Sequence, residues 1–181
     1  PRLSAPLAKE RCRSCRRTSS RPAPARIVET NITGLLNPTH ALVPNMVSLR
    51  AGHVVNIGSI AGSYPYPGGN VYGATKAFIQ HFTRNLQADL AGKGVRVTDI
   101  QPGLVGNAEF FDVRFGGDKA RAEQAKAGFR GLTAEDIADA VAWVLDRPPH
   151  VTVTQMKVFP SDQGFSALTL KKKDTPKLNM C

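Results

Sequence analysis

Two residues in the middle of the chain have the types and spacing of an acid–base site. Tyr72 and Lys76 are four positions apart, so on a helix their side chains can share one face. A tyrosine hydroxyl has a pKa of about 10, too high for a base at neutral pH. A nearby ammonium group stabilises the phenolate, and lowering the pKa by about 3 units requires about 4 kcal/mol of differential interaction. The pair predicts a tyrosine that exchanges a proton.

Two predicted strands end near this pair. The run HVVNIGS predicts a buried strand that ends at Ser59, whose hydroxyl can give a hydrogen bond to a substrate oxygen. A second run, VRVTDI, predicts a strand that is followed by Pro102 and Gly103. Ligand sites in parallel α/β sheets lie outside the carboxyl ends of the strands. A Tyr-x-x-x-Lys pair also occurs on ordinary exposed helices, but its combination with these two strand ends is specific.

Alternating strands and helices predict an α/β fold with a parallel sheet and right-handed crossovers. Thr133 predicts a helix N-cap with Asp136 near the capping-box position, whereas Pro38 interrupts an otherwise helical pattern. Residues 104–131 predict a loop with one short helix. The expected helices cover 29–49, 71–90 and the segment from Thr133 to Pro148, and a third strand covers 151–159.

The motifs resemble those of the short-chain dehydrogenases/reductases, and the resemblance covers Ile27 to Gln163. It is closest to the NADP-dependent 3-hydroxy acid (serine) dehydrogenase subgroup, through NIGSIAGSYPYPGGNVYGATKAF, VRVTDIQPGLVG and EFFDVRFGGDKAR. The resemblance implies the C-terminal part of a Rossmann-like, doubly wound parallel sheet. It also implies NAD(P)(H)-dependent hydride transfer between a small hydroxy acid or alcohol and the corresponding carbonyl, with NADP favoured over NAD.

The same resemblance implies roles for individual residues. Ser59 would orient the substrate oxygen, Tyr72 would exchange its proton, and Lys76 would lower the tyrosine pKa and hold the nicotinamide ribose. Asn31, in TNITG, matches an asparagine that anchors a water in the proton relay. No metal ligand is implied, and a homo-oligomer would form through the helix over 71–90. The residues implied to contact the cofactor are Tyr72, Lys76, Pro102, Gly103, Leu104 and Val105.

The net charge of +10 is concentrated at the two ends of the 181-residue chain. Residues 1–26 carry +7 (eight basic, one acidic), residues 164–181 carry +3 (four basic, one acidic), and 27–163 hold twelve charges of each sign. The first segment predicts a disordered basic arm, the middle a partial domain with the catalytic residues, and the last a tail. A neutral middle makes nucleic-acid binding unlikely, although the arm keeps it as a third alternative.

The Gly-rich turn T-G-x-x-x-G-x-G and the N-N-A-G stretch of the family do not occur in this sequence. The sequence therefore resembles a truncated member, in which the strand ending at Ser59 would have an unpaired edge. Two main interpretations stay open: an NADP-dependent enzyme acting on a small hydroxy acid, and a catalytically silent fragment that acts through self-association.

Composition adds a few limits. No apolar run is long enough to span a membrane, and no secretory signal is visible. Three cysteines do not make a disulfide scaffold, so a cytoplasmic setting is expected. The pair Cys12 and Cys15 lacks the second pair that a structural zinc site normally needs.

Overall fold

The computed structural model describes residues 23–106, 117–120 and 130–164. Most of the predicted basic arm, the greater part of the predicted loop over 104–131 and almost all of the predicted tail lie outside these ranges. Helical structure begins at Ala23, before the predicted domain boundary at Ile27.

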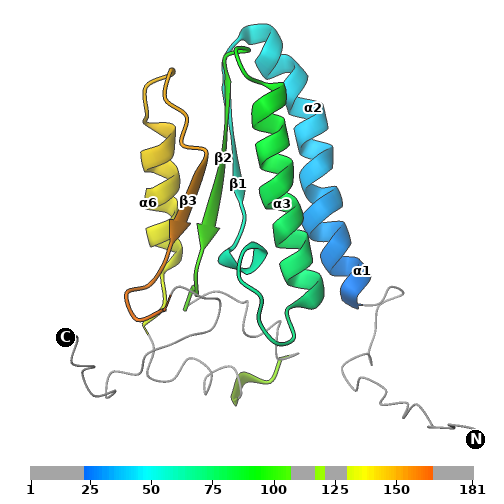
Figure 1. Ribbon diagram of the computed structural model, residues 1–181, viewed down its shortest axis with the longest axis vertical. Helices are drawn as coiled ribbons and strands as arrows, with labels where there is room; N and C mark the ends of the chain where they lie inside the picture. The colour runs from blue at the N-terminus through cyan, green and yellow to red at the C-terminus, as the bar shows by residue number, and fades with distance from the viewer. Residues whose placement is uncertain (1–22, 107–116, 121–129, 165–181) are drawn as a thin grey trace, which may run out of the picture.

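The described residues form a parallel sheet with helices on both faces (Figure 1). None of the described helices is both long and apolar enough to cross a bilayer. The strands are β1 (Gly52–Ile57), β2 (Val95–Pro102) and β3 (Gln155–Val158), and the helices are α1 (Ala23–Val28), the π-helix η1 (Glu29–Thr33), α2 (Gly34–Leu49), the 3-10 helix η2 (Ile60–Gly62), α3 (Asn70–Asp89) and α6 (Ala134–Leu145).

The central strand β2 pairs in parallel with β1 on one side and β3 on the other. The predicted parallel α/β sheet is therefore confirmed. All of β2 except Arg96 is buried, as expected for a strand covered on both faces. The register places Asn56 of β1 beside Asp99 of β2, and Asp99 beside Gln155 of β3. A row of polar residues thus crosses the sheet close to the carboxyl ends of its strands.

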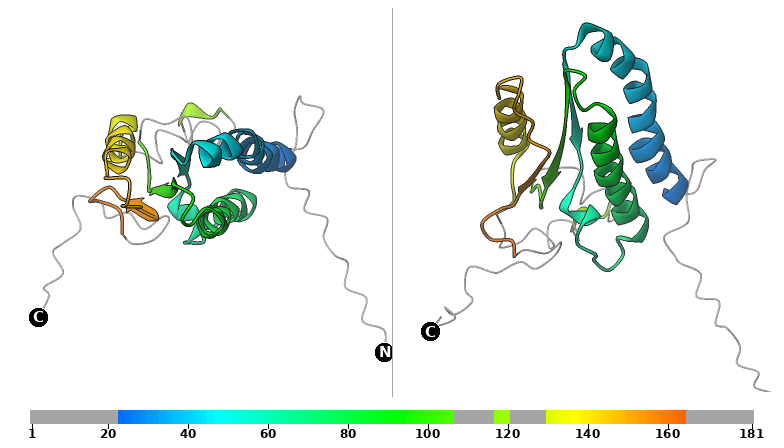
Figure 2. Two further views of the ribbon diagram at one scale, coloured as in Figure 1. Left: turned by 90° about the horizontal axis from the view of Figure 1, so that it is seen from above. Right: turned by 45° about the horizontal axis from the view of Figure 1, so that its top comes forward.

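Helices α3 and α6 cover opposite faces of the sheet, which the view from above in Figure 2 makes clear. Val97 packs against Leu86 and Leu90 at the end of α3, whereas the adjacent Arg96 donates hydrogen bonds to the carbonyls of Leu145 and Arg147 at the end of α6. Both crossovers move in the same direction across the sheet, so helices on opposite faces give them opposite hands. The expectation that both are right-handed is therefore wrong for one of them.

The first helical run continues from α1 through η1 into α2. The predicted helix over 29–49 is present, and it passes through both Pro38 and Pro44. Each proline removes one backbone hydrogen bond. Packing offsets this cost, because the last turns of α2 place Val43 and Met46 against the core.

The apolar core lies between α2, α3 and the amino ends of β1 and β2. Leu90, Val95 and Val97 form its buried centre. The partly buried residues around them are Val43, Met46, Val47, Val54 and Leu86. This core fixes the carboxyl end of α3 on the sheet, so the amino end of α3 projects beside the carboxyl ends of the strands.

Candidate active site

Ser59, one of the predicted site residues, lies two residues beyond the end of β1. Its backbone is extended (φ −171°, ψ 153°), and it caps η2 by accepting a hydrogen bond from the Ala61 backbone N–H at 3.1 Å. The cap fixes the Ser59 side chain between the strand end and the start of α3. The sequence predicted a strand that ends at Ser59, and β1 ends two residues earlier, at Ile57.

Close backbone contact joins η2 to α3. A Cβ at Gly62 would lie 2.7 Å from the Lys76 carbonyl carbon, and a Cβ at Gly73 would lie 3.1 Å from the Ala61 carbonyl oxygen. A larger residue at Gly62 would push η2 away from α3, whereas the contact at Gly73 is tight but less severe. The contact places Ser59 within hydrogen-bonding reach of Tyr72.

Tyr72 lies in the first turn of α3 and is partly buried. Burial raises the pKa of its hydroxyl, since the phenolate loses water; the hydrogen bond with Ser59 opposes this rise, and Tyr66 adds to it. The predicted lowering of the Tyr72 pKa by Lys76 is not what the described residues produce. The Tyr72 hydroxyl is held in its protonated form.

Lys76 follows Tyr72 by one turn of α3. Its Nζ donates a hydrogen bond of 2.9 Å to the Ile57 carbonyl and lies 5.7 Å from the centroid of the Tyr72 ring. Burial lowers the pKa of Lys76, and the negative charge of Asp99 opposes the change. The ammonium group is therefore fixed against the end of β1 and beside the ring of Tyr72.

Asn31 lies in the π-helix η1, a type of irregularity that often marks functional sites. Its Nδ2 donates a hydrogen bond of 2.9 Å to Thr75 Oγ1, and Thr75 donates to the Tyr72 carbonyl at 2.8 Å. Asn31 is thus tied to the helix that carries Tyr72 and Lys76.

The segment from Pro102 to Val105 leaves the sheet on the same side. Gly103 donates a hydrogen bond to the Val158 carbonyl at 2.7 Å, and Leu104 donates to Gln163 Oε1 at 2.9 Å. Val105 forms a bridge with Leu132. Four of the six residues predicted to contact the cofactor are therefore held at the carboxyl ends of β2 and β3.

Sequence reasoning missed three residues that support the site. Thr75 and Gln163 are buried and fix Asn31 and Leu104 respectively, while Asp99 is 2% exposed in the central strand. The signal for Asp99 was present, because an acidic residue interrupts the apolar run VRVTDI. Thr75 was similarly visible as a polar residue between Tyr72 and Lys76. Nothing local marks Gln163.

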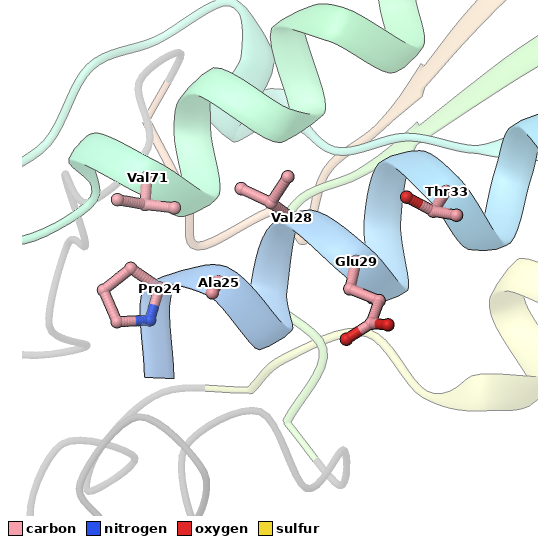
Figure 3. Close-up of a pocket in the computed structure, with 6 residues that line it drawn as sticks. All are labelled: Pro24, Ala25, Val28, Glu29, Thr33 and Val71. Atoms are coloured by element: carbon pink, nitrogen blue, oxygen red, sulfur yellow. The ribbon is translucent and has the colours of Figure 1, made fainter. Parts of the chain in front are cut away.

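A separate open groove lies between the start of the first helical run and α3 (Figure 3). None of the predicted site residues lines it. Its lining is mainly apolar, with Glu29 directed away from Val71. It is formed by Pro24, Ala25, Val28, Glu29, Thr33 and Val71.

Comparison of the sequence with known proteins identifies relatives of this chain. The family model of the short chain dehydrogenases matches residues 15–113. The NADP-dependent 3-hydroxy acid dehydrogenase YdfG of Escherichia coli (strain K12) is 48% identical over 147 residues, which cover 81% of this chain and 59% of that protein. The sulfoacetaldehyde reductase of Chromohalobacter salexigens is 48% identical over 145 residues, covering 80% of this chain and 57% of that protein. The chain thus spans somewhat more than half the length of these relatives.

Known structures agree with this result. The closed form of a serine dehydrogenase complexed with NADP+ superposes with a TM-score of 0.75 at 49% identity, covering 81% of this chain and 59% of that one. The predicted similarity to the 3-hydroxy acid (serine) dehydrogenase subgroup is confirmed, as is the Rossmann-like sheet. The family model matches residues 15–113, which is more than half of the chain. The strand ends, α3 and the loop after β2 carry the motifs on which the predicted resemblance rests. The chain therefore belongs to the short-chain dehydrogenase family.

Proposed function

We propose that this chain carries the catalytic half of an NADP(H)-dependent dehydrogenase that interconverts a small 3-hydroxy acid, or a similar alcohol, and its carbonyl compound. The observation that carries the proposal is the convergence of Ser59, Tyr72 and Lys76 outside the carboxyl ends of β1 and β2. The similarity to YdfG and to a serine dehydrogenase complexed with NADP+ supports both the reaction class and the cofactor.

The residues present fit the nicotinamide end of such a cofactor. Gly103 and Leu104 are anchored at the same end of the sheet as Ser59, and the fixed ammonium group of Lys76 would hold a ribose hydroxyl. When bound, a nicotinamide gives or accepts a hydride. The Gly-rich phosphate turn of the family does not occur in this sequence, so the fit concerns the nicotinamide end.

The chain's own residues handle the proton. In carbonyl reduction Ser59 donates a hydrogen bond to the substrate oxygen, and the protonated Tyr72 hydroxyl gives its proton to that oxygen as the carbonyl carbon gains a hydride. Burial, which raises the pKa of Tyr72, suits this direction because it keeps the donor protonated. Oxidation is the reverse transfer, in which the Tyr72 phenolate accepts the proton of the alcohol while Ser59 keeps its hydrogen bond to the substrate oxygen. Asn31 would support the relay that resupplies the proton.

A second candidate, self-association, has its own observation. Among the described residues β1 pairs with β2 alone, so one edge of β1 is open to a further strand. We also predict assembly through α3, as the family resemblance implies, and a cytoplasmic setting.

The direct test is an activity assay on the full chain. NADP+ with L-serine and NADPH with sulfoacetaldehyde would be the reactant pairs, and absorbance of NADPH the readout. Tyr72→Phe should lower the rate by about 10²- to 10⁴-fold, the range for loss of a general acid–base. Tyr64→Phe, the same change at a tyrosine outside the proposed machinery, is the control. Equal rates for Tyr72→Phe and the unaltered chain would contradict the proposal, as would NADPH binding without turnover of any tested hydroxy acid or aldehyde.

A further inference from the structure

One charged side chain beneath the proposed site has no role in the mechanism above. Asp99 is 2% exposed and occupies the central strand, on the face that α3 covers. Burying a carboxylate is costly unless charges or hydrogen bonds compensate for its lost hydration. The groups that surround the carboxylate therefore indicate its role.

The Asp99 carboxylate lies against the peptide that holds Lys76. A Cβ at Gly58 would lie 3.1 Å from Asp99 Cγ and closer still to Oδ1, so a side chain at this position would displace the carboxylate. The adjacent carbonyl, that of Ile57, accepts the 2.9 Å hydrogen bond from Lys76 Nζ. The acid and the ammonium group therefore approach the same Ile57–Gly58 peptide, one from the sheet and the other from α3.

The polar groups around Asp99 come mainly from β2 and α3. Gln101 Nε2 donates a hydrogen bond to Asp99 Oδ2. From α3, Lys76 and Arg84 bring positive charge, and Arg84 also approaches Gln155 Oε1 of β3 at 3.5 Å. The Gly58 backbone N–H also stabilises the carboxylate. The carboxylate is thus balanced by the two basic groups of α3 and clamped by Gln101.

We propose that Asp99 is a positioning residue, the buried counter-charge that holds the Lys76 ammonium group at the Ile57 carbonyl beside Tyr72. The inference deepens the proposed function, on which its catalytic meaning rests. Gln101 acts as the clamp that orients the carboxylate, and Gly58 supplies the space. Lys76 then keeps its position and its charge although it is partly buried.

The electrostatic balance supports this role. Burial lowers the pKa of Lys76, and the charge of Asp99 raises it. Burial in turn raises the pKa of Asp99, and Gln101, Lys76, Arg84 and the Gly58 backbone lower it. Without the carboxylate, burial of Lys76 would act unopposed, so the neutral amine would form at lower pH.

The test measures the protonation of Lys76 directly and needs no turnover. The full chain is labelled with trace acetic anhydride across a pH series, and acetylation of Lys76 is followed by mass spectrometry, because only the neutral amine reacts. Asp99→Asn should increase Lys76 labelling at neutral pH by about 10-fold or more, the change expected for loss of an opposite charge at close range. The matched control is Asp139→Asn, the same substitution at an exposed acid on α6.

A second variant covers the case in which Asp99→Asn does not fold. Gln101→Leu keeps the acid but removes its clamp, and should increase Lys76 labelling by a smaller factor. Unchanged labelling in whichever of these variants folds would overturn the inference. If labelling changes as expected but the chain neither binds NADPH nor turns over substrate, the Asp99–Lys76 pairing stands and the proposed function fails.

Discussion

The contact between α3 and β2 is apolar at one end and polar at the other. At the amino end of the strand, Leu90, Val95 and Val97 pack in an apolar core. At the carboxyl end, the same strand buries Asp99 and Gln101 beneath Lys76. The helix and the strand are continuous between these ends, so one pair of elements carries both a stabilising region and a polar region.

The two ends therefore have different roles: the apolar end stabilises the fold, and the polar end positions the site. Burying apolar surface stabilises by roughly 25 cal/mol per Å², whereas burying charge costs free energy unless partners compensate. Burial at the apolar end can therefore stabilise the packing of α3 on the sheet. The polar end uses that rigidity to keep Tyr72, Lys76 and Ser59 in a fixed arrangement.

Removing a core side chain should break the apolar end most severely. Leu90→Ala is expected to lower the free energy of unfolding by about 2–5 kcal/mol, through lost burial and a residual cavity. Leu42→Ala, the same change at a leucine that is 56% exposed on α2, should change it by no more than about 0.5 kcal/mol. Denaturant unfolding followed by circular dichroism measures both. Similar losses in the two variants would contradict the assignment of the core.

A methyl group between η2 and α3 should disturb the polar end. Gly62→Ala places Cβ against the backbone of Lys76 and Ala77, so an overpacking cost of about 1–3 kcal/mol is expected. The shift of η2 should also separate Ser59 from Tyr72 and reduce activity. Gly34→Ala in α2 is the control, because its nearest neighbour, the Glu29 carbonyl oxygen, is at an ordinary 3.7 Å. A Gly62→Ala chain with unaltered stability and activity would show that the close contact is not required.

The smallest effect concerns His53, a polar residue at the amino end of β1. Its Nε2 pairs with Thr98 Oγ1 at 2.8 Å, and burial, with the charge of Arg96, lowers its pKa. Below about pH 6.5, the ordinary pKa, the unfolded chain binds a proton that the folded chain resists, so stability should fall as pH decreases. His53→Gln should reduce this dependence in unfolding measured from pH 7.5 to 5. The exposed His150→Gln is the comparison, and equal pH slopes for the two variants would contradict the effect.

Much of this arrangement followed from the sequence. Apolar periodicity and turn residues located the main helices and strands, and the capping box at Thr133 and Asp136 is present with both hydrogen bonds. The spacing of Tyr72 and Lys76 and the strand end at Ser59 predicted the site. These features depend on local chemistry, which a sequence displays directly.

Features that depend on distant contacts did not follow. The hydrogen bond between Asn31 and Thr75 joins residues 44 positions apart, and that between Leu104 and Gln163 spans 59 positions. The direction of the Tyr72 pKa change was also missed, because burial, which depends on tertiary packing, raises the pKa of the hydroxyl. Similarly, local pattern does not reveal that α6 covers the face opposite α3.

The measurement that tests the central claim most directly is thermal unfolding of the full chain with and without NADPH. A ligand at about 100 times its Kd adds about 2.7 kcal/mol, which should raise the Tm by several degrees. We expect the shift in the unaltered chain and in Lys93→Ala, an exposed control, and its loss in Lys76→Ala. A cooperatively unfolding chain whose Tm does not respond to NADPH, or responds equally in Lys76→Ala, would contradict a nicotinamide site at the carboxyl ends of β1 and β2.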